Sequence, residues 1–143
     1  MTNLQAAVGV AQLKNIEKLV DLKRENAKKY TKLLKHTNGL ELPVEKEYAK
    51  NVYWMYGIVL DKSLGFDARA LAEKLLQHGI QTRPFFYPLH LQPVWKKMKI
   101  KIKPGKYPVA ERIAKYGLYL PSGLGLKKEE VKEVCDTIKK LLT

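Results

Sequence analysis

The first 42 residues of this chain contain no proline, and their apolar side chains recur with the spacing of an α-helix. Steps of three and four residues dominate the series Leu4, Val8, Ala11, Ile16, Leu19, Val20, Ala27, Tyr30, Leu33 and Leu34. We expect one amphipathic helix from about Leu4 to His36, ending at Asn38-Gly39, where glycine favours a left-handed stop. At 1.5 Å per residue it would be roughly 50 Å long, so we expect it to pack against something outside this sequence. Gly9 lies inside it, either as a tolerated glycine or as a close packing contact.

The rest of the chain predicts an α+β domain with a small three-stranded sheet packed by helices. The length of 143 residues suits a single small domain beside the helix, so we divide the chain into 1–38, an interdomain long helix, and 39–143, a small C-terminal domain. The expected strands are 51–60, 80–83 and 118–120, and the expected helices are 67–79, 108–116 and 128–142, with a stiff loop of prolines and aromatic residues at 84–95.

The formal charge of +13 comes mainly from lysine, because 23 of the 27 basic residues are Lys. Lysine is the ordinary solvated surface residue, whereas arginine recognises phosphate in a bidentate way. A solvated lysine face therefore explains the charge best, and an anion-attracting surface is the second interpretation. We expect no nucleic-acid partner. The densest lysine run, 95–106, alternates with apolar residues as an extended segment does.

Composition also narrows the cell compartment. No run of about 18 apolar residues is present, so we expect no membrane span, and the first residues do not form a secretory signal. One cysteine cannot form an internal disulfide, which fits a reducing cytoplasm. Cys135 falls on the apolar stripe of the last expected helix, which indicates a core position.

The usual catalytic motifs are missing: GxGxxG, a P-loop, GxSxG and HExxH do not occur. The acidic residues are scattered beside lysines, so we expect no metal site and no catalytic pair. The segment 79–90 is different, because Arg83, Tyr87 and His90 stand among aromatic residues and prolines. Prolines stiffen the segment and so lower the entropy cost of holding these polar side chains in place. A segment of this kind suits recognition of an anionic, flat or sugar-like ligand. An ordinary aromatic minicore with a surface arginine explains the same residues, and the residues alone leave both interpretations open.

Several stretches, taken in their order and spacing, carry a resemblance that covers nearly the whole chain: Met1 to Ala7, Gln12-Leu13, Ala27 to Tyr30, Val52 to Tyr56, Gly79 to Pro93, Pro108 to Arg112, Leu118 to Gly123 and the closing helix. Together they resemble the C-terminal part of the DegT/StrS family of PLP-dependent sugar aminotransferases. The TRPFFYPLH stretch is most similar to members that aminate a 4-keto sugar nucleotide, such as perosamine synthases.

The resemblance implies a fold-type I aminotransferase whose N-terminal domain, with the Schiff-base lysine, is absent from this sequence. We therefore expect a fragment, arising from a truncated gene, an internal start or an excised domain, that is inactive alone and supplies no catalytic residue. The parent reaction moves an amino group from an amino acid, with glutamate as the expected donor, through PLP to a keto sugar nucleotide for polysaccharide or amino-sugar biosynthesis. PLP would not be held by this chain alone.

The resemblance also assigns roles to individual residues. It implies that Asn3 reaches the cofactor phosphate of a neighbouring subunit, although Asn3 would also serve simply as a helix N-cap. It places Arg83, Phe85, Tyr87 and His90 at the mouth where the nucleotide-sugar substrate enters. The expected assembly is a homodimer or a pair with a full-length relative. The alternative function is a non-catalytic basic module for binding or assembly, which the overlong helix suggests.

Overall fold

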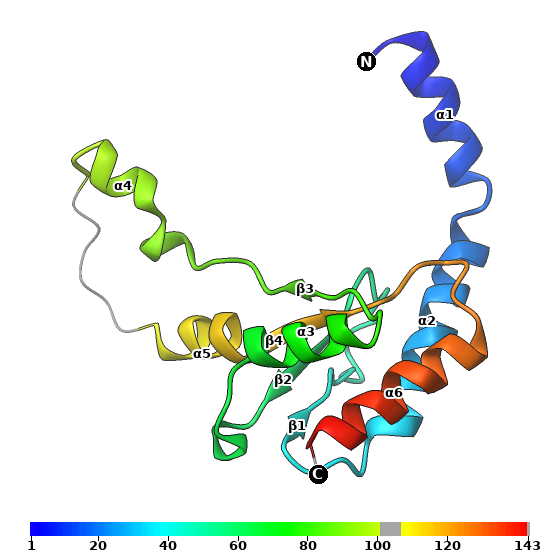
Figure 1. The fold of residues 1–143 in the computed structure, drawn as a ribbon. Coiled ribbons are helices and arrows are strands. Elements are labelled where there is room, and N and C mark those ends of the chain that lie inside the picture. Colours follow the sequence, from blue (N-terminus) through cyan, green and yellow to red (C-terminus); the bar gives the residue numbers. More distant parts are fainter. Residues whose placement is uncertain (101–106, 143) are drawn as a thin grey trace.

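The computed structural model describes residues 1–100 and 107–142. Figure 1 shows the order of the elements along the chain. The α-helices are α1 (Asn3–Leu13), α2 (Ile16–Leu34), α3 (Ala68–Gln77), α4 (Pro93–Lys97), α5 (Pro108–Tyr116) and α6 (Lys128–Leu142). The strands are β1 (Leu40–Glu41), β2 (Tyr56–Leu60), β3 (Arg83–Pro84) and β4 (Gly117–Leu120), and the 3-10 turns are Lys62–Leu64 and Leu89–Leu91. Half of the lysine run 95–106, residues 101–106, lies outside the described residues.

The described strands form one antiparallel sheet in the order β1-β2-β4-β3. The α+β class is confirmed, but the expectation of three strands was wrong by one. β1 pairs only Leu40 with Leu60 and Glu41 with Val59, which is too short to produce an alternating pattern. β3 occupies residues 83–84 and not the expected 80–83, and Pro84 fits there because β3 is an edge strand.

The single long helix predicted from Leu4 to His36 is divided into α1 and α2 by Lys14 and Asn15. Asn15 turns its side chain back, and its Nδ2 donates to the carbonyl of Ala11 at 3.1 Å. Asparagine competes in this way with the helical hydrogen bonds of its own backbone, which explains the interruption. The periodic apolar pattern continues across Lys14 and Asn15, so the pattern did not indicate that the helix is interrupted there.

The N-terminus of α1 is capped by Thr2 and not by Asn3. The Thr2 hydroxyl accepts from the backbone N–H of Gln5, and the Gln5 side chain accepts from the N–H of Thr2, which forms a capping box. Asn3 is the first residue of the helix. Capping therefore leaves the Asn3 amide uncommitted.

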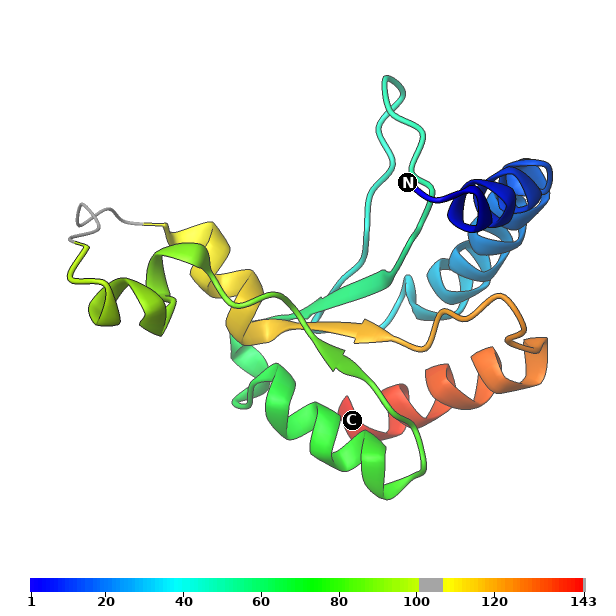
Figure 2. The same cartoon turned by 90° about the horizontal axis from the view of Figure 1, so that it is seen from above.

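One face of the sheet is covered by α2, α3 and α6, and the core lies between them (Figure 2). Tyr56, Ile58 and Leu60 alternate toward this core from β2. Tyr30 of α2 stacks on Tyr56 with ring centroids 4.9 Å apart. The remaining buried apolar residues include Ala27, Leu34, Leu71, Leu75, Leu118, Leu120, Val131, Cys135 and Ile138. The prediction that Cys135 is a core residue is confirmed.

The opposite face of the sheet is built around two glycines. Phe85 stacks on Tyr119 of β4 with centroids 4.3 Å apart. A Cβ on Gly57 would lie 2.6 Å from Phe85, and one on Gly117 would lie 2.4 Å from Phe85 and 2.3 Å from the carbonyl oxygen of Ile113. The ring therefore sits where only glycine leaves room.

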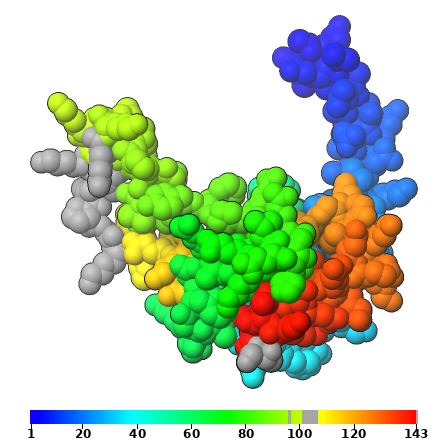
Figure 3. All heavy atoms as spheres, viewed as in Figure 1, coloured from blue at the N-terminus to red at the C-terminus, as the bar shows by residue number. Residues whose placement is uncertain are grey.

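Two parts of the chain project from the body, α1 on one side and the segment that carries α4 on the other (Figures 1 and 3). α1 buries none of its residues, and its Leu4, Val8, Val10 and Leu13 are exposed. A Cβ on Gly9 would meet nothing within 4 Å, so no part of the described chain packs closely there. Within the described residues, no helix combines the length and apolarity needed to cross a membrane.

We predict that Gly117→Ala lowers the free energy of unfolding by about 1–3 kcal/mol, because the new methyl group overlaps Phe85 and the Ile113 carbonyl. Gly9→Ala is the matched control, since its methyl group enters open space in a helix and should change stability by less than about 1 kcal/mol. Urea unfolding followed by circular dichroism measures both. Equal effects of the two substitutions would contradict this account of Gly117.

We also predict that stability falls at alkaline pH. Burial raises the pKa of Cys135 to about 12 and that of Tyr56 to about 12, from ordinary values of 9.0 and 10.0. Above these ordinary values the unfolded chain releases protons that the folded chain retains, so the free energy of unfolding decreases as pH rises toward about 12. Urea midpoints between about pH 8 and about pH 11 measure the decrease. Tyr56→Phe should make the part above about pH 10 less steep, and the remainder comes from Cys135 and from Tyr30, whose pKa is also raised by burial.

Candidate functional site

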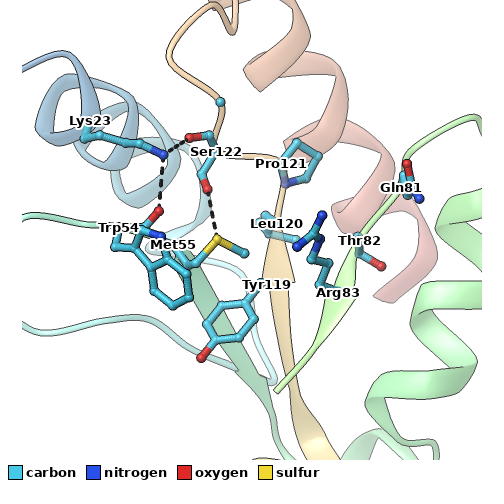
Figure 4. A pocket seen from close by; sticks show the side chains of 11 residues that line it. Lys23, Trp54, Met55, Gln81, Thr82, Arg83, Tyr119, Leu120, Pro121 and Ser122 are labelled. Atoms are coloured by element: carbon cyan, nitrogen blue, oxygen red, sulfur yellow. Dashed lines mark hydrogen bonds between the residues drawn. The ribbon is translucent and has the colours of Figure 1, made fainter. Parts of the chain in front are cut away.

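A cavity of about 360 Å³ lies where α2, the end of β4 and the edge strand β3 meet. Figure 4 shows its lining side chains converging from four separate segments. These segments contribute Lys23 from α2, Trp54 and Met55 before β2, Gln81 to Arg83 at β3, and Tyr119 to Gly123 at the end of β4. Among the described lining residues, Lys23 belongs to the interior of a helix and the others to strands and loops, so the chemistry of the cavity comes from side chains and from the loop after β4.

Three donors on one stripe of α2 hold the turn that forms the cavity wall. The Lys23 ammonium donates to the carbonyl of Ser122, and Asn26 Nδ2 donates to the carbonyl of Gly123 at 3.3 Å. The hydroxyl of Tyr30 donates to the carbonyl of Pro121 at 2.8 Å. Spacings of three and four place these side chains on the same helix face. The turn after β4 is thereby fastened through three consecutive carbonyls.

Lys23 also donates to the carbonyl of Trp54 at 3.2 Å, so one ammonium joins α2, the segment before β2 and the turn after β4 (Figure 4). Partial burial lowers the pKa of Lys23 by disfavouring its charged form. An ammonium has three N–H groups, and two of them are occupied by these carbonyls. The third has no hydrogen-bond acceptor among the residues that the structure describes.

The Trp54 carbonyl is positioned by a locally unusual backbone. Tyr53 has a positive φ of 48°, which is uncommon for a residue other than glycine. Asn51 Oδ1 accepts from the Tyr53 N–H at 2.8 Å. Arg24 pairs with both carboxylate oxygens of Glu45 at 2.9 Å and donates to the carbonyl of Asn51. Such backbone strain is held only where the surroundings over-determine it, and it clusters at binding sites.

The ion pair between Arg24 and Glu45 shifts the pKa of both side chains. The hydrogen bond with Glu45 raises the pKa of Arg24, and the hydrogen bond with Arg24 lowers the pKa of the Glu45 carboxyl. Each partner therefore favours the charged form of the other. The connection between β1 and β2 is anchored to α2 by an ion pair that persists at neutral pH.

The four residues that the resemblance places at the substrate entrance lie in different surroundings. Arg83 lines the cavity. Phe85 is packed on Tyr119 and the two glycines, so the minicore interpretation describes its packing in this chain. Tyr87 is exposed. His90 lies in a separate apolar hollow beside α5. Its Nε2 is 2.9 Å from Oε1 of Glu111, and its ring contacts the ring of Tyr107. The roles that the resemblance gives to these residues stay predictions.

Asn3 lies at the outer end of the projecting helix α1, away from the cavity (Figure 1). It does not join the other predicted residues within this chain. A role for it toward a ligand therefore requires a surface that is not part of the described residues, as the resemblance implies.

Sequence reasoning missed Lys23, Gln81, Thr82 and Ser122 as cavity residues. The spacing of Lys23, Asn26 and Tyr30 was the available signal. Lys23 and Asn26 place polar groups beside the apolar stripe of α2, and Tyr30 belongs to the stripe through its ring but carries a hydroxyl. Asn26 and Tyr30 are buried. Their partners are distant in sequence, so the spacing alone did not identify the wall that they hold.

The cavity does not have the donor set that PLP needs. A lysine free to form a Schiff base and a carboxylate at the pyridine nitrogen are required. Lys23, the lysine that lines the cavity, is engaged by two carbonyls, and neither Asp nor Glu is among the lining residues that the structure describes. Nor does a cluster of three His, Cys, Asp or Glu side chains suited to a metal ion occur in the described ranges 1–100 and 107–142.

Comparison with known families gives a match along almost the whole chain. The model of the DegT/DnrJ/EryC1/StrS aminotransferase family matches residues 1–139. A GDP-perosamine synthase of Vibrio cholerae is 37% identical over 141 residues, which cover 97% of this chain and 37% of that protein. A GDP-perosamine synthase of Escherichia coli O157:H7 is 34% identical over 139 residues, which cover 96% of this chain and 35% of that protein.

Solved structures agree with this match. The aminotransferase TlmJ from Streptoalloteichus hindustanus superposes with a TM-score of 0.81 at 28% sequence identity, covering 94% of this chain and 35% of that one. This chain thus spans little more than a third of the length of the relatives that it matches.

We predict that Tyr30→Phe lowers the free energy of unfolding by about 1–2 kcal/mol, because it leaves the partly buried carbonyl of Pro121 without its donor. Tyr48→Phe is the matched control, since Tyr48 is 89% exposed and should change stability by less than about 0.5 kcal/mol. Urea unfolding measures both variants. A loss confined to Tyr48→Phe, or no loss in either, would contradict the proposed fastening of the turn.

Proposed function

Because the chain belongs to the DegT/DnrJ/EryC1/StrS aminotransferase family, we propose that it is the C-terminal part of a nucleotide-sugar aminotransferase. The proposed reaction moves an amino group from an amino acid, with glutamate as donor, through PLP to a keto sugar nucleotide. The observation that carries the proposal is the match to GDP-perosamine synthase of Vibrio cholerae over 97% of this chain. Amino-sugar or polysaccharide biosynthesis is the corresponding biological role.

In this proposal the chain binds and orients substrate, and it contributes no group that reacts. Arg83 in the cavity attracts an anionic part of the nucleotide sugar, and the exposed Tyr87 meets the sugar or base. Phe85 packs on Tyr119, which lines the same cavity. His90 is held by Glu111 in the separate hollow beside α5, so its role at the substrate mouth rests on the resemblance. PLP supplies the electron sink for the amino transfer, from outside this chain.

The projecting helix α1 supports the proposal that a further protein surface completes the site. Its exposed Leu4, Val8, Val10 and Leu13 form apolar area that water does not favour. Burial of this area in a homodimer, or in a pair with a full-length relative, would carry Asn3 toward the cofactor phosphate of the neighbouring subunit. The division at residue 38 into interdomain helix and small domain is part of the same proposal.

The exposed α1 also favours a second candidate function, a non-catalytic assembly module that pairs with a full-length relative. Sedimentation of the chain with and without such a relative distinguishes the two. Pairing without any gain of amino transfer supports the module, whereas a monomer whose first helix is well protected from hydrogen exchange contradicts it.

We predict that the chain alone binds no PLP at a defined lysine. After incubation with PLP and borohydride reduction, mass spectrometry should find the cofactor spread over many lysines, because Lys23, the lysine of the cavity, is engaged by two carbonyls and has no Asp or Glu among the described lining residues. Labelling of one lysine would contradict the proposed inactivity of the isolated chain.

Activity should return when the missing part is supplied. A chimera that joins the N-terminal portion of the Vibrio cholerae relative to residues 1–143 should form GDP-perosamine from glutamate and the keto sugar nucleotide. The N-terminal portion alone and this chain alone are the controls. A folded chimera that binds PLP but transfers no amino group would contradict the proposal.

A further inference from the structure

A hollow of about 390 Å³ lies at the end of the sheet opposite the cavity. β2 leaves the cavity after Met55 and ends at Leu60, shortly before Lys62. The antiparallel β4 begins at Gly117 and runs back to the cavity. The turn after β2, the start of α3 and the end of α5 line the hollow, and α3 contacts α5. The amino transfer proposed above uses none of these residues.

Two aromatic rings that line this hollow each have a lysine ammonium over one face. Nζ of Lys74 lies 4.7 Å from the centroid of the Phe66 ring, and Nζ of Lys115 lies 5.3 Å from that of Tyr116. Both rings are half-buried, whereas Lys62, Lys74 and Lys115, the lysine rim, are exposed. A ring face attracts an ammonium but does not neutralise its charge. The rim therefore keeps its positive charge.

The carboxylates nearest the lysine rim in sequence are engaged elsewhere. Asp67 lines the hollow, and its carboxylate accepts from the backbone N–H of Ala70 at 3.1 Å. Asp61 accepts from the N–H of Ser63 at 2.8 Å. None of the three rim lysines forms an ion pair with a carboxylate among the residues that the structure describes. A carboxylate from outside the chain would meet lysines without an ion-pair partner.

Asp67 also distinguishes between kinds of anion. The N–H groups at a helix N-terminus bind phosphate readily, but the Asp67 carboxylate already occupies that place at the start of α3. A compact phosphate group there would meet a like charge. Carboxylates on separate side chains of a peptide can each approach a different lysine, and a ring between them can pack on Phe66 and Tyr116. The hollow therefore suits an acidic peptide better than a phosphate.

The charge of the whole chain favours one source for such a peptide. The formal charge is +13, so two copies of this chain repel each other. A protein with a net negative charge is attracted, because complementary charges steer two proteins together. The hollow and the cavity lie at opposite ends of β2 and β4, so a protein bound at the hollow leaves the cavity open.

We propose that the hollow with the lysine rim binds an acidic peptide segment of a partner protein. The rim lysines pair with its carboxylates, and Phe66 and Tyr116 contact an aromatic side chain between them. This binding is separate from the proposed amino transfer and requires neither PLP nor a nucleotide sugar.

Nuclear magnetic resonance of the isotope-labelled chain of 143 residues measures this binding. The probe is the peptide Glu-Asp-Phe-Asp-Glu with blocked ends, at about 0.15 M salt, where long-range attraction is largely screened. The amide signals of Gly65, Phe66 and Tyr116 should shift with one dissociation constant, whereas those of Ser122 and Gly123 at the cavity should not. Shifts spread evenly over the lysine-bearing surface, or absent from the hollow, would overturn the proposal.

Substitution of two rim lysines tests their charge. Lys62→Gln combined with Lys115→Gln should weaken binding by about fivefold or more, the effect expected for two partly exposed ion pairs. Lys28→Gln combined with Lys32→Gln is the matched control, because it removes the same charge from two exposed lysines of α2 and should change the affinity less than about twofold. Circular dichroism checks that both variants are folded. Equal weakening in the two variants would reduce the binding to general attraction by a basic chain and would overturn the proposal.

Changes in the peptide test the same contacts with the protein unaltered. Gln-Asn-Phe-Asn-Gln lacks the charges and Glu-Asp-Ser-Asp-Glu lacks the ring, so each should bind more weakly than the first peptide. Unchanged affinity of either peptide would contradict the proposed contacts. Inorganic phosphate is titrated in parallel. Phosphate binding that depends on Lys62 and Lys115, without binding of the acidic peptide, would assign the hollow to phosphate and would also overturn the proposal.

Discussion

Three side chains of one helix stripe hold the turn after the central strand β4, and the candidate site depends on them. Lys23, Asn26 and Tyr30 bind the carbonyls of Ser122, Gly123 and Pro121. Carbonyl groups left unpaired in this partly buried turn would cost free energy, so the helix and the loop stabilise each other. Lys23 extends the connection to Trp54. The cavity wall is thus part of the packing of the domain and is not a separate loop.

Local signals in the sequence were sufficient for the elements that have clear ends. The Asp67 carboxylate accepts from the N–H of Ala70 where α3 begins, Pro108 opens α5, and α6 spans the predicted 128–142. The break at Asn15 depends on a single side-chain hydrogen bond, and β1 has two residues, so neither changes the apolar pattern. Tertiary pairing, and not local preference, forms β1 and β3.

The candidate site was predicted only at Arg83, for a physical reason. Proline and aromatic residues marked the segment 79–90, but they do not indicate which face of the sheet each side chain meets. Phe85 fills the space above Gly57 and Gly117, and His90 turns toward Glu111. Gln81 and Thr82 adjoin Arg83, but the other lining residues come from segments that are distant in sequence. Lys23 and Ser122, which share a hydrogen bond in the cavity wall, are 99 residues apart. Such proximity follows from the topology of the sheet, which local patterns do not encode.

The interruption at Asn15 separates two mechanical units. Within a continuous helix, bending one end displaces the other, because the hydrogen-bonded turns act as a stiff rod. Here the bond of Asn15 to Ala11 closes α1 before α2 begins, and α2 restarts at Ile16 with its own first turn. The apolar surface of α1, through which we propose assembly, and the cavity residue Lys23 of α2 therefore belong to two helices that are joined only through Lys14 and Asn15.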